Sequence, residues 1–161
     1  EKLKKSITSE KKKNIIAKKL SEAAKKEAEQ YSKTNDKICF LNLEYYYDGV
    51  EFEMGLRIGL QSELDMLKEK YGNEYKNGED LRSKLGGDFV FYKPLLEDEI
   101  NKETQDMLDI AKQIDIDKRD LDLGIFVMLS KDTTKLLEQT EWKREINITD
   151  DFIIFEPFMY D

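Results

Sequence analysis

Carboxylates are the side chains of this sequence that could do chemistry. The 161-residue chain has 35 Asp and Glu residues, no His, and Cys39 as its single cysteine. Without an imidazole, no Ser-His pair, Cys-His pair or His-bearing metal triad can form. A single thiol excludes an internal disulfide and a thiolate zinc site. Any catalytic mechanism would therefore depend on carboxylates, and we expect no cofactor.

Two Glu-x-Lys segments come nearest to a catalytic motif, Glu74-Tyr75-Lys76 and Glu141-Trp142-Lys143. Nucleases of the restriction-endonuclease type carry Asp…Glu-x-Lys on adjacent strands, where the carboxylates hold Mg²⁺ and the Lys steadies the nucleophile. Here the first segment falls in a predicted loop and the second at a predicted helix end. A chain so rich in Glu and Lys also produces such pairs by chance. A Mg-dependent nuclease is therefore an alternative and not the leading hypothesis.

The segment from Asp48 to Gly55, Asp-Gly-Val-Glu-Phe-Glu-Met-Gly, resembles the nucleoside deoxyribosyltransferase pattern Asp-Gly-Thr-x-x-Glu-x-Gly. In that family the Glu, which corresponds to Glu53, is a nucleophile at the start of a helix that follows a strand. Val50 stands here in place of the Thr, and the family's N-terminal glycine-bearing strand has no counterpart. The resemblance adds glycosyl transfer to the carboxylate-only alternatives.

An acidic cluster surrounds Lys118 and Arg119 and consists of Asp115, Asp117, Asp120 and Asp122. A calcium loop of the EF-hand type needs ligands at alternate positions, a central Gly and a distal Glu, and this cluster lacks that arrangement. Gly86-Gly87 is likewise not followed by the residues of a phosphate-binding loop. We interpret both segments as turns and expect no metal site.

The elements that must position these side chains begin with a β-hairpin. Residues 38–60 alternate apolar and polar side chains on both sides of Asp48-Gly49, the favoured centre of a two-residue type I′ turn. Such a turn sets Tyr47 opposite Val50. The pairs that follow all lie on one apolar face: Tyr45 with Phe52, Leu43 with Met54, Leu41 with Leu56, and Cys39 with Ile58.

Helix-like and strand-like segments follow each other along the rest of the chain. We predict helices at about 10–32 (capped by Ser9), 61–71, 79–85, 96–113 and from Asp132 to Trp142. We predict further strands at 88–92, 121–129 and 146–156. This order indicates an α+β fold, an antiparallel sheet of about five strands with helices packed on one face, in preference to a helical bundle.

Charge divides the chain unevenly. Residues 1–33 carry eleven Lys and five Glu, a net charge of +6, so the rest carries −14 within the overall −8. We predict one domain, 1–161, in which 1–33 form a basic helical arm and 37–161 an acidic α+β body. The arm is a solvated helix, a contact for an anionic partner, or a contact for the acidic body of a neighbouring chain. Because the acidic remainder repels phosphate, we expect a basic protein partner, with nucleic acid reached only through the Lys-rich arm.

The outer face of the predicted hairpin holds the candidate binding residues Glu44, Tyr46, Glu51 and Glu53. Aromatic side chains set among charged ones are typical of protein-binding surfaces. We therefore expect a non-catalytic, acidic protein-binding domain, an inhibitor, immunity-type or regulatory factor, with the carboxylate-only enzyme as the alternative.

The sequence also bears on location. No apolar run approaches the roughly 18 residues of a membrane span, and no signal peptide is visible, so we expect no membrane partner. A lone cysteine favours a reducing, cytoplasmic compartment. Because the first residue is Glu1 and not Met, we expect an N-terminal piece to precede it.

Overall fold

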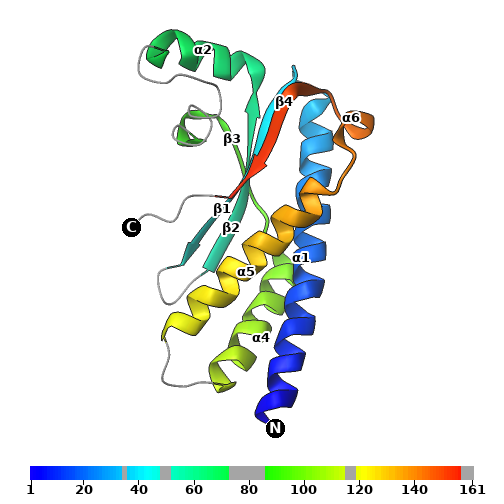
Figure 1. Cartoon of the computed structure of the whole chain (residues 1–161), viewed down its shortest axis with the longest axis vertical. Helices are drawn as coiled ribbons and strands as arrows, with labels where there is room; N and C mark the ends of the chain where they lie inside the picture. Colours follow the sequence, from blue (N-terminus) through cyan, green and yellow to red (C-terminus); the bar gives the residue numbers. More distant parts are fainter. Residues whose placement is uncertain (34–35, 48–51, 73–85, 115–118, 157–161) are drawn as a thin grey trace.

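The computed structural model describes residues 1–33, 36–47, 52–72, 86–114 and 119–156. Within these ranges the chain is α+β, with five α-helices and a four-stranded mixed sheet (Figure 1). The helices are α1 (Lys2–Ser32), α2 (Gln61–Tyr71), α4 (Asp98–Ile114), α5 (Arg119–Glu138) and α6 (Trp142–Glu145), with a short 3₁₀ turn at Gly86–Asp88. The strands are β1 (Ile38–Tyr47), β2 (Phe52–Leu60), β3 (Phe91–Pro94) and β4 (Ile148–Phe155).

The predicted hairpin is confirmed as β1 and β2, but its register differs from the prediction by two residues. Tyr47 pairs with Phe52 and Leu43 with Leu56, whereas a two-residue turn would pair Leu43 with Met54. A shift of two residues leaves the described side chains from Phe40 onward on their predicted faces, because side chains along a strand alternate with period two. The expected Asp48-Gly49 turn lies outside the described residues.

An irregularity between Ile38 and Phe40 changes the start of β1. Ile38 and Leu41 both join the inner core, while Cys39 packs with Phe40 in a second cluster. An extra residue in one strand re-aims the side chains on either side of it. The prediction that Cys39 faces inward opposite Ile58 is therefore wrong.

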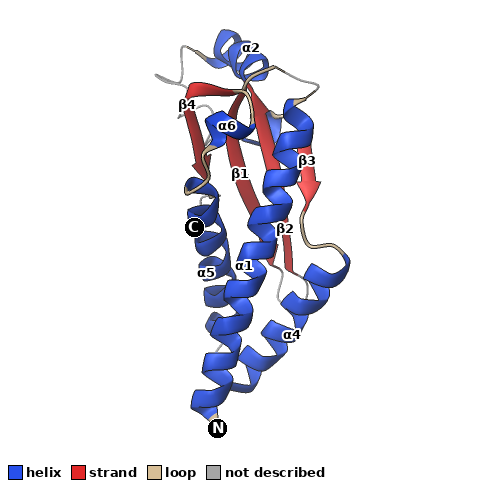
Figure 2. Cartoon of the chain, turned by 90° about the vertical axis from the view of Figure 1, so that its right-hand side faces the viewer, coloured by secondary structure: helices blue, strands red, loops and turns tan. Residues whose placement is uncertain are grey.

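The sheet has the order β3-β2-β1-β4 and is mixed (Figure 2). The predicted final strand is confirmed as β4, but it runs parallel to β1, whereas β3 is antiparallel to β2. The expected all-antiparallel sheet of about five strands is only roughly matched.

The missing fifth strand is the one expected at 121–129, where the chain forms helix α5 instead. Among the α5 side chains that the structure describes, the buried ones have a helical spacing: Leu129, Ser130, Thr133, Thr134 and Leu137. The Leu, Ile and Val residues at 121–129 alternate with period two and therefore predict a strand, although this stretch lies within α5. Asp132, the expected cap of a later helix, lies inside α5.

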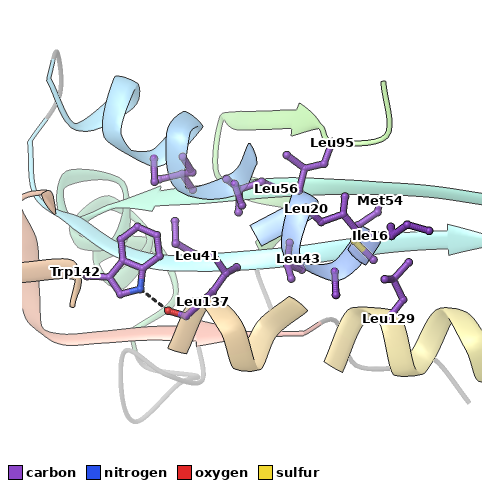
Figure 3. Close-up of a cluster of buried hydrophobic side chains, with 14 of the residues drawn as sticks. Ile16, Leu20, Leu41, Leu43, Met54, Leu56, Leu95, Leu129, Leu137 and Trp142 are labelled. Carbon is purple, nitrogen blue, oxygen red and sulfur yellow. Dashed lines mark hydrogen bonds between the residues drawn. The ribbon is translucent and has the colours of Figure 1, made fainter. Parts of the chain in front are cut away.

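Helices α1, α4 and α5 pack together on the inner face of the sheet (Figures 1 and 2). Their shared core with the hairpin includes Ile16 and Leu20 from α1, Leu43 and Leu56 from the sheet, and Leu137 from α5 (Figure 3). Trp142 closes one end of this core, and its indole N–H donates to the Leu137 carbonyl at 2.8 Å. The core thus unites the first helix, the hairpin and the last helices.

The opposite face of the sheet is covered at one end by α2, so the helices do not all lie on one face as predicted. Leu64 of α2 packs there with Phe40 and Phe89 in the second cluster. The Phe40 and Phe89 rings meet edge to face, with centroids 4.6 Å apart. This cluster leaves the other end of the outer face uncovered by any described element.

Helix α1 begins at Lys2, and the expected cap Ser9 is a buried residue inside the helix. Its buried apolar stripe includes Ile16, Leu20 and Ala24. The buried amine of Lys13 pairs with Asp132 of α5 at 3.0 Å and with Glu10 at 2.8 Å.

None of the described helices combines the length and apolar character that a bilayer span requires.

Candidate functional site

The uncovered end of the outer sheet face is the candidate site. Its side chains come from alternate positions of β1 and β2 and from β3: Asn42, Glu44, Tyr46, Glu53, Arg57 and Tyr92. Strand alternation places these residues on the face away from the inner core. The face combines carboxylates, aromatic rings and one guanidinium.

Glu44 is held by Arg57 and is not a free carboxylate. Arg57 Nε donates to Glu44 Oε1 at 2.6 Å, and Nη2 donates to Oε2 at 3.2 Å. Arg57 Nη1 also donates to the Phe89 carbonyl at 2.7 Å, which ties the face to the loop before β3. Such two-pronged pairing fixes geometry as well as charge. Glu44 therefore positions Arg57 on this face, and its expected role as a contact for a partner stays a prediction.

Tyr92 packs against Arg57 of the Glu44–Arg57 pair. The Arg57 guanidinium sits 5.1 Å from the centre of its ring, within cation–π range. The ring also covers Gly55, where any Cβ would collide with it. Burial first, and then the Glu44 and Glu53 carboxylates, raise the pKa of the Tyr92 phenol, while Arg57 acts in the opposite direction. The phenol therefore stays protonated at neutral pH and can donate a hydrogen bond.

Tyr46 and Glu53 are the exposed residues of the predicted set. They are directly paired across β1 and β2, so their side chains lie next to each other. Tyr46 is 61% exposed and Glu53 is also exposed. The fourth predicted residue, Glu51, lies outside the described residues. The structure thus brings three of the predicted residues onto one face, two of them open to solvent.

Tyr92 belongs to this face, although the sequence reasoning did not select it. The strand predicted at 88–92 ends at Tyr92, whereas β3 covers Phe91–Pro94. The pairing of Arg57 with Tyr92 across β2 and β3 brings it to the site. Strand alternation would assign its face only once the partner strand of β3 were known.

The carboxylates that the structure describes do not converge on a site where a carboxylate-only enzyme could act. Across the ranges the structure describes, no cluster of three or more Asp, Glu or Cys side chains could hold a metal ion. Glu141 precedes α6 and pairs with Arg144 at 2.9 Å, while Trp142 beside it is buried. Glu53 lies inside a strand, whereas the deoxyribosyltransferase resemblance implies the start of a helix. The side chains of the other Glu-x-Lys segment, 74–76, and of the 115–122 acidic cluster lie outside those that the structure describes.

The arrangement therefore offers an exposed aromatic ring and an exposed carboxylate on a braced strand pair, and no assembled reaction centre among the described residues. Comparison with protein-family models, with curated proteins and with solved structures finds no match for this chain.

Proposed function

We propose that this chain is a protein-binding domain that recognises a basic protein through the outer face of its hairpin, as an inhibitor, immunity-type or regulatory factor would. The observation that carries the proposal is the Tyr46–Glu53 pair, an exposed ring beside an exposed carboxylate. Tyr is among the residues that dominate binding energy at interfaces. A carboxylate beside it selects a cationic group on the partner.

The support beneath this pair favours binding over loose solvation. Arg57 holds Glu44 on the neighbouring position of the same face and is itself anchored to the Phe89 carbonyl. A contact surface that is already ordered loses less conformational entropy when a partner binds. The net charge of −14 outside residues 1–33 would also steer a basic partner toward the body.

The test is a kinetic measurement on a partner captured by the immobilised chain and then purified. We expect its association rate to fall as salt rises, because the screening length shrinks from about 10 Å at 0.1 M to about 3 Å at 1 M. Glu53→Lys should slow association further, and Tyr46→Ala should speed dissociation.

Glu22→Lys is the matched control, since Glu22 is an exposed carboxylate on α1, behind the other side of the sheet. It changes the net charge by the same amount as Glu53→Lys but should leave the association rate near that of the wild type. A partner whose association rate ignores salt and responds equally to both reversals would reject the proposal.

A further inference from the structure

The outer side of α1 carries a row of exposed lysines. Lys4, Lys11 and Lys18 follow each other at intervals of seven residues, so they lie on one side of the helix, opposite the buried stripe that contains Ile16 and Leu20. At a rise of 1.5 Å per residue, this lysine row is about 21 Å long. Figure 2 shows α1 in front of the sheet, between α5 and α4, so the row faces away from the rest of the chain.

Lysines on the flanks of α1 already have partners on other helices. The pairs are Lys13 with Asp132 of α5, Lys19 with Glu103 of α4, and Lys25 with Glu145 of α6. The amines of Lys4, Lys11 and Lys18, by contrast, have no ion-pair partner in the part of the chain that the structure describes. The positive charge of the lysine row is therefore available to an acidic surface.

Two exposed isoleucines lie within the lysine row. Ile7 is 48% exposed and Ile15 is 53% exposed, and helical spacing puts both on the outer side of α1. The aliphatic stems of the neighbouring lysines extend this apolar surface. A surface that joins apolar groups and positive charge favours contact with an acidic protein surface over solvation alone.

The neighbouring helix α4 provides a surface of the opposite charge. Its outer side lies opposite the buried residues Thr104, Met107 and Leu108. This side carries four exposed carboxylates and one exposed amine, a net charge of −3 against the +3 of the lysine row: Asp98, Glu99, Lys102, Asp106 and Asp109. We call these five residues the acidic row.

The two rows lie at matching heights on antiparallel helices. Lys19 of α1 pairs with Glu103 of α4, and from there α4 runs toward the N-terminal end of α1 (Figure 1). Lys11 lies about two turns before Lys19, and Asp109 lies about two turns after Glu103, so Lys11 and Asp109 are level. A two-fold axis parallel to the helices keeps each residue at its height and sets the lysine row of one copy against the acidic row of another.

We propose that this chain forms a two-fold symmetric dimer in which the lysine row of each copy docks on the acidic row of the other. Every contact then occurs twice, because a two-fold interface is reciprocal. Ile7 and Ile15 lie in this contact and are removed from water. The face that carries Tyr46 and Glu53 is on the other side of the sheet and stays open, so this inference does not depend on the proposed function.

Sedimentation velocity over a range of chain and salt concentrations is the first test. We expect a monomer–dimer equilibrium that shifts toward monomer as salt rises, because salt screens the attraction between the rows. Each chain has a net charge of −8, so salt would instead strengthen a non-specific association. A chain that stays monomeric at every concentration, or that associates more strongly in high salt, would overturn the proposal.

Charge reversal on each row is the second test. Lys11→Glu reverses a charge on α1, and Asp106→Lys with Asp109→Lys reverses the level part of α4. Each variant should raise the dissociation constant of the dimer about tenfold or more, because attraction becomes repulsion in both symmetric contacts. Mixed in equal amounts, the two variants should form a heterodimer, since the reversed rows match each other and the unchanged rows also match.

Lys68→Glu is the matched control, because Lys68 is exposed on α2, on the other side of the sheet. It changes the net charge as Lys11→Glu does and should leave the dissociation constant near that of the wild type. Lys11→Ala removes the charge without adding repulsion, suits a helix, and should weaken the dimer less than Lys11→Glu. Equal effects of Lys11→Glu and Lys68→Glu, or mixed variants that stay monomeric, would overturn the proposal. Either result leaves the proposed function in place, because slow association of Glu53→Lys with the basic partner needs no dimer.

Discussion

At the scale of single residues, the Glu44–Arg57 pair fixes the positions of the side chains on the candidate face. Both side chains are largely shielded from solvent and are joined by two hydrogen bonds. Glu44→Gln leaves the Arg57 charge without its counter-ion, so we expect a loss of about 1–3 kcal/mol in the free energy of unfolding. Urea denaturation measures this loss. Glu53→Gln is the comparison, and since Glu53 is exposed we expect a change within about 0.5 kcal/mol. Equal effects of the two variants would contradict the positioning role.

Tyr92 makes the stability of the face depend on alkaline pH. Burial and nearby carboxylates raise the pKa of its phenol above the ordinary value, which means that folding favours the neutral form. Its contribution to stability is therefore complete below about pH 10 and is lost as the pH rises through the raised pKa. Urea denaturation between about pH 9 and 11 should show a shallower decline for Tyr92→Phe than for the wild type. Burial raises the pKa of Tyr31 and Tyr45 as well, so a residual decline should remain in the variant. Identical pH profiles would contradict the assignment.

At the scale of elements, two glycines let aromatic rings lie flat on β2. A Cβ at Gly59 would collide with the Phe40 ring, and one at Gly55 with the Tyr92 ring. Phe40 is fully buried, whereas Tyr92 is 39% exposed and can turn outward. We therefore expect Gly59→Ala to cost about 1–3 kcal/mol and Gly55→Ala about 1 kcal/mol or less. Thermal and urea denaturation of the two variants test this order. A larger loss of stability for Gly55→Ala than for Gly59→Ala would contradict it.

At the scale of the whole molecule, α1 shares the core of the sheet. Leu20 of α1 and Leu56 of β2 are both fully buried in one cluster (Figure 3). Leu20→Ala and Leu56→Ala should each cost about 2–5 kcal/mol, with single cooperative unfolding transitions. Deletion of 1–33 would remove Ile16, Ala17, Leu20 and further core residues, so we expect residues 37–161 alone to lack a cooperative transition. A truncated chain that unfolds cooperatively would instead support a separable basic arm.

The sequence by itself determined the features that depend on local period. Alternation along 38–60 predicted the hairpin and, from Phe40 onward, the faces of its described side chains, since a strand places neighbours on opposite sides whatever its register. Helical spacing predicted α2 with the bounds observed, and nearly those of α4. The alternation along the hairpin also placed Glu44, Tyr46 and Glu53 on one outer face.

Only the tertiary structure decided what depends on partners far apart in the chain. The choice of Arg57 as the partner of Glu44 and the arrival of Tyr92 require the register of three strands. The parallel direction of β4 depends on the path through α4, α5 and α6, which no local pattern records. The alternating Leu, Ile and Val residues at 121–129 indicated a strand, but this stretch lies within helix α5. Packing of α5 against α1 outweighed that local preference, because a helix can turn the adjacent residues Leu129 and Ser130, and Thr133 and Thr134, toward the same core, whereas a strand would point neighbours to opposite sides.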